Sequence, residues 1–158
     1  MLDSQEIRRR IPHRFPFLLV DRVLEVSPDR VLGEKYVTVN EPYFRGHFPS
    51  APVMPGVLLL ESMFQLLWIQ WGGPHGLHLC GVKRLKFRRS VVPGDVIELE
   101  AQLLAADPAQ ELAPGWLRFK CYGRVEGKVA VEGELIVRLR EPKLAKESSP
   151  NQREPAKA

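Results

Sequence analysis

The sequence has few cysteines, no long apolar run and no apolar segment at its start. Its two cysteines, Cys80 and Cys121, form neither a CxxC motif nor a spacing typical of zinc ligands. We therefore expect no disulfide scaffold and no metal site, and we interpret both cysteines as small core residues. Polar side chains interrupt every apolar run before it reaches about 18 residues, so no membrane span is predicted. Residues 1–14 are polar and basic, unlike a secretory signal, which predicts a cytoplasmic location.

Positively charged residues are only slightly in excess of negatively charged ones. The formal net charge of +4 would suit an acidic partner, but an excess of this size is common in soluble proteins. The length of 158 residues and the 44% hydrophobic content are typical of one globular domain, which we place at residues 1–140. Residues 141–158 have no aromatic and few aliphatic side chains, which predicts a disordered tail.

Segments rich in branched and aromatic residues alternate with turn signals along most of the chain. Turn residues such as Pro28-Asp29 and Glu126-Gly127 separate neighbouring segments, and the first two segments are expected to form a hairpin. The composition of these segments is typical of β-strands. The predicted strands span residues 17–26, 30–40, 79–87, 96–105, 116–125 and 129–139.

One long apolar segment, Val57–Trp71, follows a loop over residues 41–55 in which prolines and glycines restrict the backbone. Its apolar side chains cover most of a helical wheel, which is typical of a helix buried at the centre of a fold. Glycines and a proline at 72–76 end this helix. One buried helix and about six strands predict an α+β domain, with an antiparallel sheet wrapped around the helix.

Glu61 is an acidic residue within this apolar helix. A buried carboxylate without a partner loses much of its solvation energy, so burial would raise its pKa and favour the protonated form. A carboxyl group that is protonated near neutral pH can act as a general acid, and Gln65, one turn later on the same face, would orient it. Alternatively, Glu61 lies at the helix edge in water or pairs with a structural arginine.

The loop before the helix contains His47. Histidine titrates near neutral pH, which suits a general base, although a single loop histidine is also common as a surface residue. Gly56, at the start of the helix, would present an unpaired N–H at the positive end of the helix dipole, where a carbonyl oxygen can bind. A base, an acid and such a donor are the groups needed to remove a proton next to a thioester and expel a β-hydroxyl group.

Four segments carry a family resemblance, and the strongest signal is GHFP followed by PGVLLLE, which contain His47 and Glu61. The segments are HRFPFLLVDR (13–22), VNEPYFRGHFP (39–49), PVMPGVLLLESMFQ (52–65) and FRRSVVPGD (87–95). In these motifs and in their order, the chain resembles the 3-hydroxyacyl-[acyl-carrier-protein] dehydratases of fatty-acid synthesis.

The resemblance implies a hot-dog fold and a homodimer at least, with a trimer of dimers as a larger alternative. It implies that His47 of one subunit faces Glu61 of the other across an acyl tunnel. His47 would remove the C2 proton, Glu61 would protonate the departing hydroxyl, and the Gly56 N–H would bind the thioester carbonyl. No metal or redox cofactor would be required. The other residues expected at the substrate are Phe48, Val57 and Gln65.

Alternative functions remain open at this point. The sequence VMPG and the helix after Glu61 resemble the bifunctional dehydratase/isomerases, whereas glutamate at position 61 is typical of the dehydration-only group, which we favour. A hot-dog thioesterase would use a carboxylate and water to cleave the thioester. A non-catalytic subunit that binds acyl carriers is a further alternative, although the presence of both His47 and Glu61 disfavours it.

A basic run over residues 83–89, KRLKFRR, alternates in part with apolar residues. It is either the solvated face of a strand or a docking surface for an acidic acyl carrier protein. In the second case, complementary charge would accelerate the encounter between the carrier protein and the enzyme. No recognised nucleic-acid-binding motif accompanies the run, so nucleic-acid binding is disfavoured. The candidate docking residues are Lys83, Arg84, Lys86, Arg88 and Arg89.

Overall fold

The computed structural model of the protein describes residues 1–105 and 113–140. The predicted disordered tail lies outside the described residues, and the domain boundary at residue 140 stays a prediction. The helices and strands, in chain order, are α1 (Ser4–Arg10), β1 (Arg22–Val26), β2 (Arg30–Tyr36), the 3-10 helix η1 (Pro42–Arg45), α2 (Gly56–Trp71), β3 (Leu77–Phe87), β4 (Val96–Leu103), β5 (Trp116–Val125) and β6 (Lys128–Leu139).

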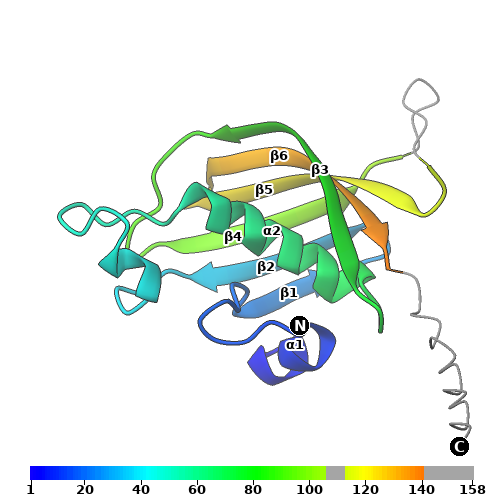
Figure 1. Ribbon diagram of the computed structural model, residues 1–158, viewed down its shortest axis with the longest axis horizontal. Helices are drawn as coiled ribbons and strands as arrows, with labels where there is room; N and C mark the ends of the chain where they lie inside the picture. The colour runs from blue at the N-terminus through cyan, green and yellow to red at the C-terminus, as the bar shows by residue number, and fades with distance from the viewer. Residues whose placement is uncertain (106–112, 141–158) are drawn as a thin grey trace, which may run out of the picture.

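The strands form one antiparallel sheet in the order β1-β2-β4-β5-β6-β3. The sheet curves around α2, which crosses its concave face, while α1 packs beside β1 at one side (Figure 1). The strand β3 lies at the edge of the sheet and pairs only with β6 among the described strands. The predicted α+β fold with six strands and a central helix is confirmed, as is the hairpin of the first two strands.

The helix α2 is the centre of the core. Its side chains at Leu59, Met63, Leu66 and Leu67 are almost completely buried against the sheet. The backbone of β2 comes so close to the helix that a Cβ atom at Gly33 would lie 2.8 Å from Leu66 Cδ1. Glycine permits such a close approach because it has no side chain. No helix within the described residues is long and apolar enough to cross a bilayer.

The N-terminal region contains a helix that was not predicted and a first strand that is shorter than predicted. Residues 4–10 form the helix α1, whose N-cap Asp3 accepts hydrogen bonds from two backbone N–H groups and forms a capping box with Glu6. The first strand begins at Arg22, and the segment 17–21 before it is not a strand. In that segment the Leu19 N–H and the Phe17 carbonyl bond to a side chain of α2, which replaces the strand pairing.

The two cysteines have different environments. Cys121 is completely buried, as predicted, whereas Cys80 is exposed, so the interpretation of Cys80 as a core residue was wrong. Cys80 lies at an irregularity in the pairing of β3 with β6, between Leu79 and Gly81. Because β3 is an edge strand with an irregular register, its side chains do not alternate simply between core and solvent.

Candidate active site

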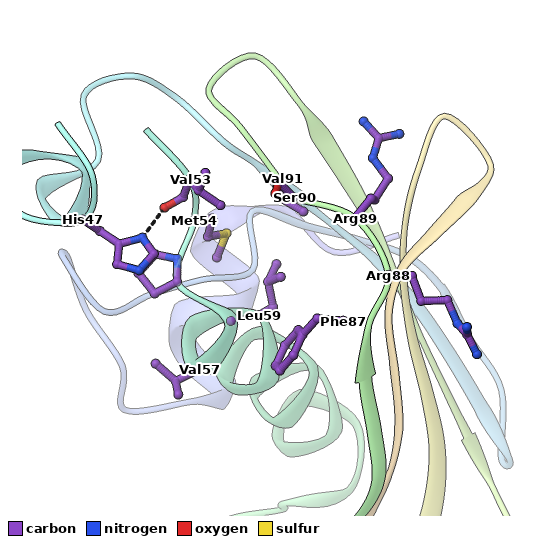
Figure 2. A pocket seen from close by; sticks show the side chains of 12 residues that line it. His47, Val53, Met54, Val57, Leu59, Phe87, Arg88, Arg89, Ser90 and Val91 are labelled. Atoms are coloured by element: carbon purple, nitrogen blue, oxygen red, sulfur yellow. Dashed lines mark hydrogen bonds between the residues drawn. The ribbon is translucent and has the colours of Figure 1, made fainter. Parts of the chain in front are cut away.

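The loop before α2 fixes the position of His47. Its backbone N–H donates to the Tyr43 carbonyl at 2.9 Å, which continues the turn of η1. Its ring nitrogen Nδ1 lies 2.6 Å from the Val53 carbonyl oxygen, at the other end of the same loop (Figure 2). A carbonyl only accepts, so Nδ1 carries the proton in this contact and a neutral His47 has its lone pair on Nε2. The ring therefore presents a base at Nε2.

Phe48, next to His47, has an unusual backbone conformation. Its φ of 55° lies in the left-handed region, which is uncommon for a bulky residue and costs about 1–3 kcal/mol. The side chain is 61% exposed, and its ring centroid lies 4.4 Å from that of His47. Strained backbone of this kind is often found at functional sites. An exposed apolar ring against the base is consistent with the predicted substrate contact.

A cavity of about 650 Å³ lies between the His47 loop, the start of α2 and the segment after β3. Figure 2 shows that the side chain of Phe87 projects toward the helix, while Arg88 and Arg89 extend away from His47. Cavities of about 300–1,000 Å³ are typical of small-molecule sites. His47, Gly56 and Val57 all line this cavity, so the structure brings these three predicted site residues together.

Gly56 is the first residue of α2, so its N–H has no acceptor within the helix. A Cβ atom at this position would lie 2.9 Å from the ring atoms Cε1 and Cζ of Phe87. Glycine at this position lets the Phe87 ring pack against the helix start. The helix dipole adds positive potential at this end of α2.

Glu61 lies one and a half turns along α2, where its side chain is 20% exposed. Burial raises the pKa of this carboxyl above its ordinary value, and the hydrogen bond from Gln65 offsets part of that rise. The prediction of a buried glutamate that favours protonation agrees with this environment. Among the described residues, no arginine or lysine pairs with Glu61, so the alternative of a structural ion pair with an arginine is not supported.

Gln65 holds Glu61 and does not line the cavity. It is completely buried, and its Nε2 donates to Glu61 Oε1 at 2.9 Å and to the Phe17 carbonyl at 2.7 Å. Its own oxygen accepts the Leu19 N–H at 2.8 Å. Every polar group of this amide is therefore used within the protein. This geometry supports the orienting role predicted for Gln65, while direct contact with substrate stays a prediction.

One residue near Glu61 was not identified from its chemistry in the sequence. The His13 ring nitrogen Nε2 lies 3.5 Å from Glu61 Oε1. His13 is the first residue of the HRFPFLLVDR motif, so the resemblance contained it without assigning it a role. A residue distant in sequence reaches Glu61 because segment 13–21 crosses the face of α2 that carries Gln65.

Within one chain, His47 and Glu61 belong to different surroundings. His47 lines the cavity at the start of α2, and Glu61 is not among its lining residues. The contacts of Glu61 are instead with His13 and Gln65. In the part of the chain that the structure describes, no three His, Cys, Asp or Glu side chains cluster as metal ligands would.

The basic run, which covers the end of β3 and the two residues after it, is partly balanced by nearby carboxylates. Arg84 Nη1 lies 2.9 Å from Glu134 Oε1, and Arg88 Nε lies 2.8 Å from Glu132 Oε1, both on β6. Arg89 has Asp95 and Glu126 at 4.0 Å. Three of the five cations, Arg84, Arg88 and Arg89, therefore have carboxylate partners within 4.0 Å. Docking by the five cations stays a prediction.

Comparisons with known proteins show the family of the chain. A family model described as FabA-like domain matches residues 11–139. The chain is 44% identical over 142 residues to the 3-hydroxyacyl-[acyl-carrier-protein] dehydratase FabZ of Acetivibrio thermocellus, a match covering 85% of this chain and 92% of that protein. It is 54% identical over 110 residues to the FabZ of Thermus thermophilus, with 66% and 78% covered. The chain belongs to the 3-hydroxyacyl-[acyl-carrier-protein] dehydratase family.

Solved structures related to this dehydratase confirm the hot-dog fold. The dehydratase heterocomplex ApeI:P from Xenorhabdus doucetiae has a TM-score of 0.65 at 22% identity, with 85% of this chain and 91% of that chain covered. The (R)-hydratase from A. caviae has a TM-score of 0.58 at 22% identity, with 74% and 98% covered. At this level of identity the likeness concerns the fold alone.

Proposed function

We propose that this dehydratase acts on 3-hydroxyacyl chains with His47 as the general base and Glu61 as the general acid. His47 Nε2 takes a proton from C2, and the electrons of that bond move toward the thioester oxygen. The C3 hydroxyl leaves with a proton from Glu61. The products are a trans-2-enoyl thioester and water, and return of the proton from His47 to Glu61 restores the site.

The tautomer of His47 supports the role of base. The contact between Nδ1 and the Val53 carbonyl leaves Nε2 without a proton, and it also supports the imidazolium that forms when Nε2 gains one. The Gly56 N–H, in the same cavity, would bind the thioester oxygen as negative charge develops on it. General acid–base catalysis by such groups contributes about 10²–10⁴-fold to a rate.

The observation that carries this proposal is that His47 and Gly56 share a cavity which Glu61 does not line. A second copy of the chain would supply Glu61 across a dimer interface. Apolar side chains exposed around the cavity support this arrangement, since Val57 is 71% exposed and Phe87 is 53% exposed. The free edge of β3 would continue the sheet into the partner.

The proposed substrate is an acyl chain carried as a phosphopantetheine thioester on an acyl carrier protein. The apolar lining of the cavity suits the chain, and the names of the related proteins favour dehydration over the alternative of thioester hydrolysis. A cytoplasmic location is part of the same proposal.

Mixing two inactive variants tests the arrangement across two chains. His47→Ala and Glu61→Gln should each remove most dehydration, measured by ultraviolet absorbance of the enoyl thioester. A mixed dimer would contain one site with both native groups and one with neither. Random reassortment of equal amounts should therefore restore about a quarter of the native activity, as expected for a symmetric dimer.

The control is each variant dissociated and reassociated with itself, which should stay inactive. A mixture that forms mixed dimers, shown by differently tagged chains, yet stays inactive would mean that His47 and Glu61 act within one chain. Near-native turnover by either folded single variant would contradict the assigned roles themselves.

A further inference from the structure

We infer that His13 is a positioning residue for the reaction, whose neutral ring holds Glu61 by its Oε1 atom and leaves Oε2 for the substrate hydroxyl. This inference rests on the proposed role of Glu61 as the general acid. It adds a residue from the N-terminal segment to a site otherwise formed by the His47 loop and α2.

The contacts of Glu61 favour one of its two oxygens. Gln65 Nε2 donates to Oε1 at 2.9 Å, and His13 Nε2 lies 3.5 Å from the same Oε1 atom. Among the described residues, no hydrogen bond to Oε2 is present. The hydrogen bond from Gln65, with His13 beside the same oxygen, restricts rotation of the carboxyl group and leaves its other oxygen for a substrate.

The His13 ring is held by packing and has no other hydrogen-bond partner among the residues that the structure describes. It meets Trp68 edge-on at a centroid distance of 5.3 Å, and its side chain is 16% exposed. Its Nδ1 is buried without a hydrogen-bond partner among the described residues. Nε2 is therefore the nitrogen with a polar neighbour, and placing the ring proton on Nε2 leaves no buried N–H unpaired.

The charges around His13 keep its ring neutral. Burial lowers the pKa of His13, and the nearby cations Arg14 and Arg140 lower it further. The acidic group that faces it is Glu61. A neutral donor suits this position because it stabilises the Glu61 carboxylate formed during the reaction less strongly than an imidazolium would. Glu61 can then regain its proton for the next turnover.

The 3.5 Å separation is longer than an ordinary N–H···O hydrogen bond. Glu61 favours the protonated form here, so the contact is weak before the reaction. When Glu61 gives its proton to the departing hydroxyl, the new negative charge attracts the His13 N–H and shortens the contact. The interaction is thus stronger in the transition state than in the ground state, which is the condition for raising kcat.

Three variants of His13 test this inference. His13→Phe keeps the ring against Trp68 but removes both nitrogens. His13→Gln places an amide N–H near the position of Nε2, whereas His13→Asn places it near the position of Nδ1. We expect His13→Phe and His13→Asn to lower kcat by about tenfold, the usual value of a hydrogen bond to a charged group, with little change in KM. His13→Gln should recover most of that loss.

The pH dependence of kcat gives a measurement that a purely structural role would not change. Glu61 must be protonated to act, so kcat falls as the pH rises through its pKa. Loss of the His13 donor destabilises the carboxylate, raises that pKa and moves the alkaline limb of the profile to higher pH. The shift should appear in His13→Phe and His13→Asn and be absent in His13→Gln.

The inference would be overturned if the alkaline limb of the kcat profile stayed at its native pH in His13→Phe. It would also be overturned if His13→Asn and His13→Gln recovered kcat equally. Circular dichroism and melting temperatures identify variants that fail to fold. If His13→Phe fails to fold, the comparison of His13→Gln with His13→Asn decides the question. Glu61→Gln separates the two proposals. If that variant is active, the proposed role of Glu61 fails; if it is inactive while His13 variants keep the native profile, only the role of His13 fails.

Discussion

The surroundings of His47 and of Glu61 differ in how they position the side chain proposed to transfer a proton. His47 lies on a loop and is held by backbone contacts within a few residues, to the Tyr43 and Val53 carbonyls. Glu61 lies on a helix and is held by side chains, one of which comes from the N-terminal segment. Local backbone contacts fix which nitrogen of a histidine is basic. Burial and distant side chains set the protonation of the carboxyl group.

The largest effect is expected from Glu61→Gln, which keeps the shape of the side chain but removes its proton chemistry. Dehydration should fall by about 10²-fold or more, measured with a carrier-bound substrate. The stability of the variant, in contrast, should exceed that of the wild type at high pH. The raised pKa of Glu61 means that the folded wild type loses stability as the pH rises through that value, whereas glutamine does not titrate.

Melting temperatures of wild type and Glu61→Gln, measured from pH 5 to pH 9, check this sign. The variant should become increasingly more stable than the wild type as the pH rises. Equal melting temperatures at every pH would show that the environment of Glu61 does not favour the protonated form. Burial would then not set the protonation of Glu61, as the comparison with His47 assumes.

The next largest effect is expected from Gln65→Met, which removes the hydrogen bond to Glu61 and leaves the His47 loop unchanged. The Leu19 N–H and the Phe17 carbonyl lose their partner, at a cost of about 1–3 kcal/mol for each buried group. Urea denaturation measures this loss. We also expect the alkaline limb of kcat to move to higher pH, because a donor to Glu61 is lost. An unchanged limb would contradict the orienting role.

A smaller effect is expected from Gly56→Ala at the His47 end of the site. The new Cβ would lie 2.9 Å from two ring atoms of Phe87, and such overpacking costs about 1–3 kcal/mol. KM for the acyl substrate should rise as the ring moves. Adding Phe87→Leu, which lacks those ring atoms, should restore KM, and failure of this rescue would show that the ring is not the cause.

The smallest effect is expected from Arg84→Gln combined with Arg88→Gln, because both arginines already pair with glutamates on β6. If the basic run docks an acidic carrier, KM for a carrier-bound substrate should rise about two- to threefold, as for exposed ion pairs. KM for a short free thioester should not change. Equal changes for both substrates would exclude docking at this surface.

More of the fold than of the detailed side-chain contacts could be predicted from the sequence. The apolar wheel of Val57–Trp71 predicted the buried central helix, and alternating segments predicted six strands, since these periodicities depend only on which faces meet the core. The helix α1 was missed although Asp3 and Glu6 formed a recognisable capping box. The strand predicted over 17–26 begins only at Arg22, because Gln65 takes the backbone groups of Phe17 and Leu19.

By itself, the sequence determined the family and the central helix, and it predicted the pair His47 and Glu61, because these depend on residue types at fixed spacings along one motif. Only the tertiary structure decided which oxygen of Glu61 is held, that His13 reaches it, and that Cys80 faces solvent. The physical reason is that these features depend on segments distant in sequence. Burial and hydrogen-bond partners at such positions follow from chain packing, and no local pattern specifies them.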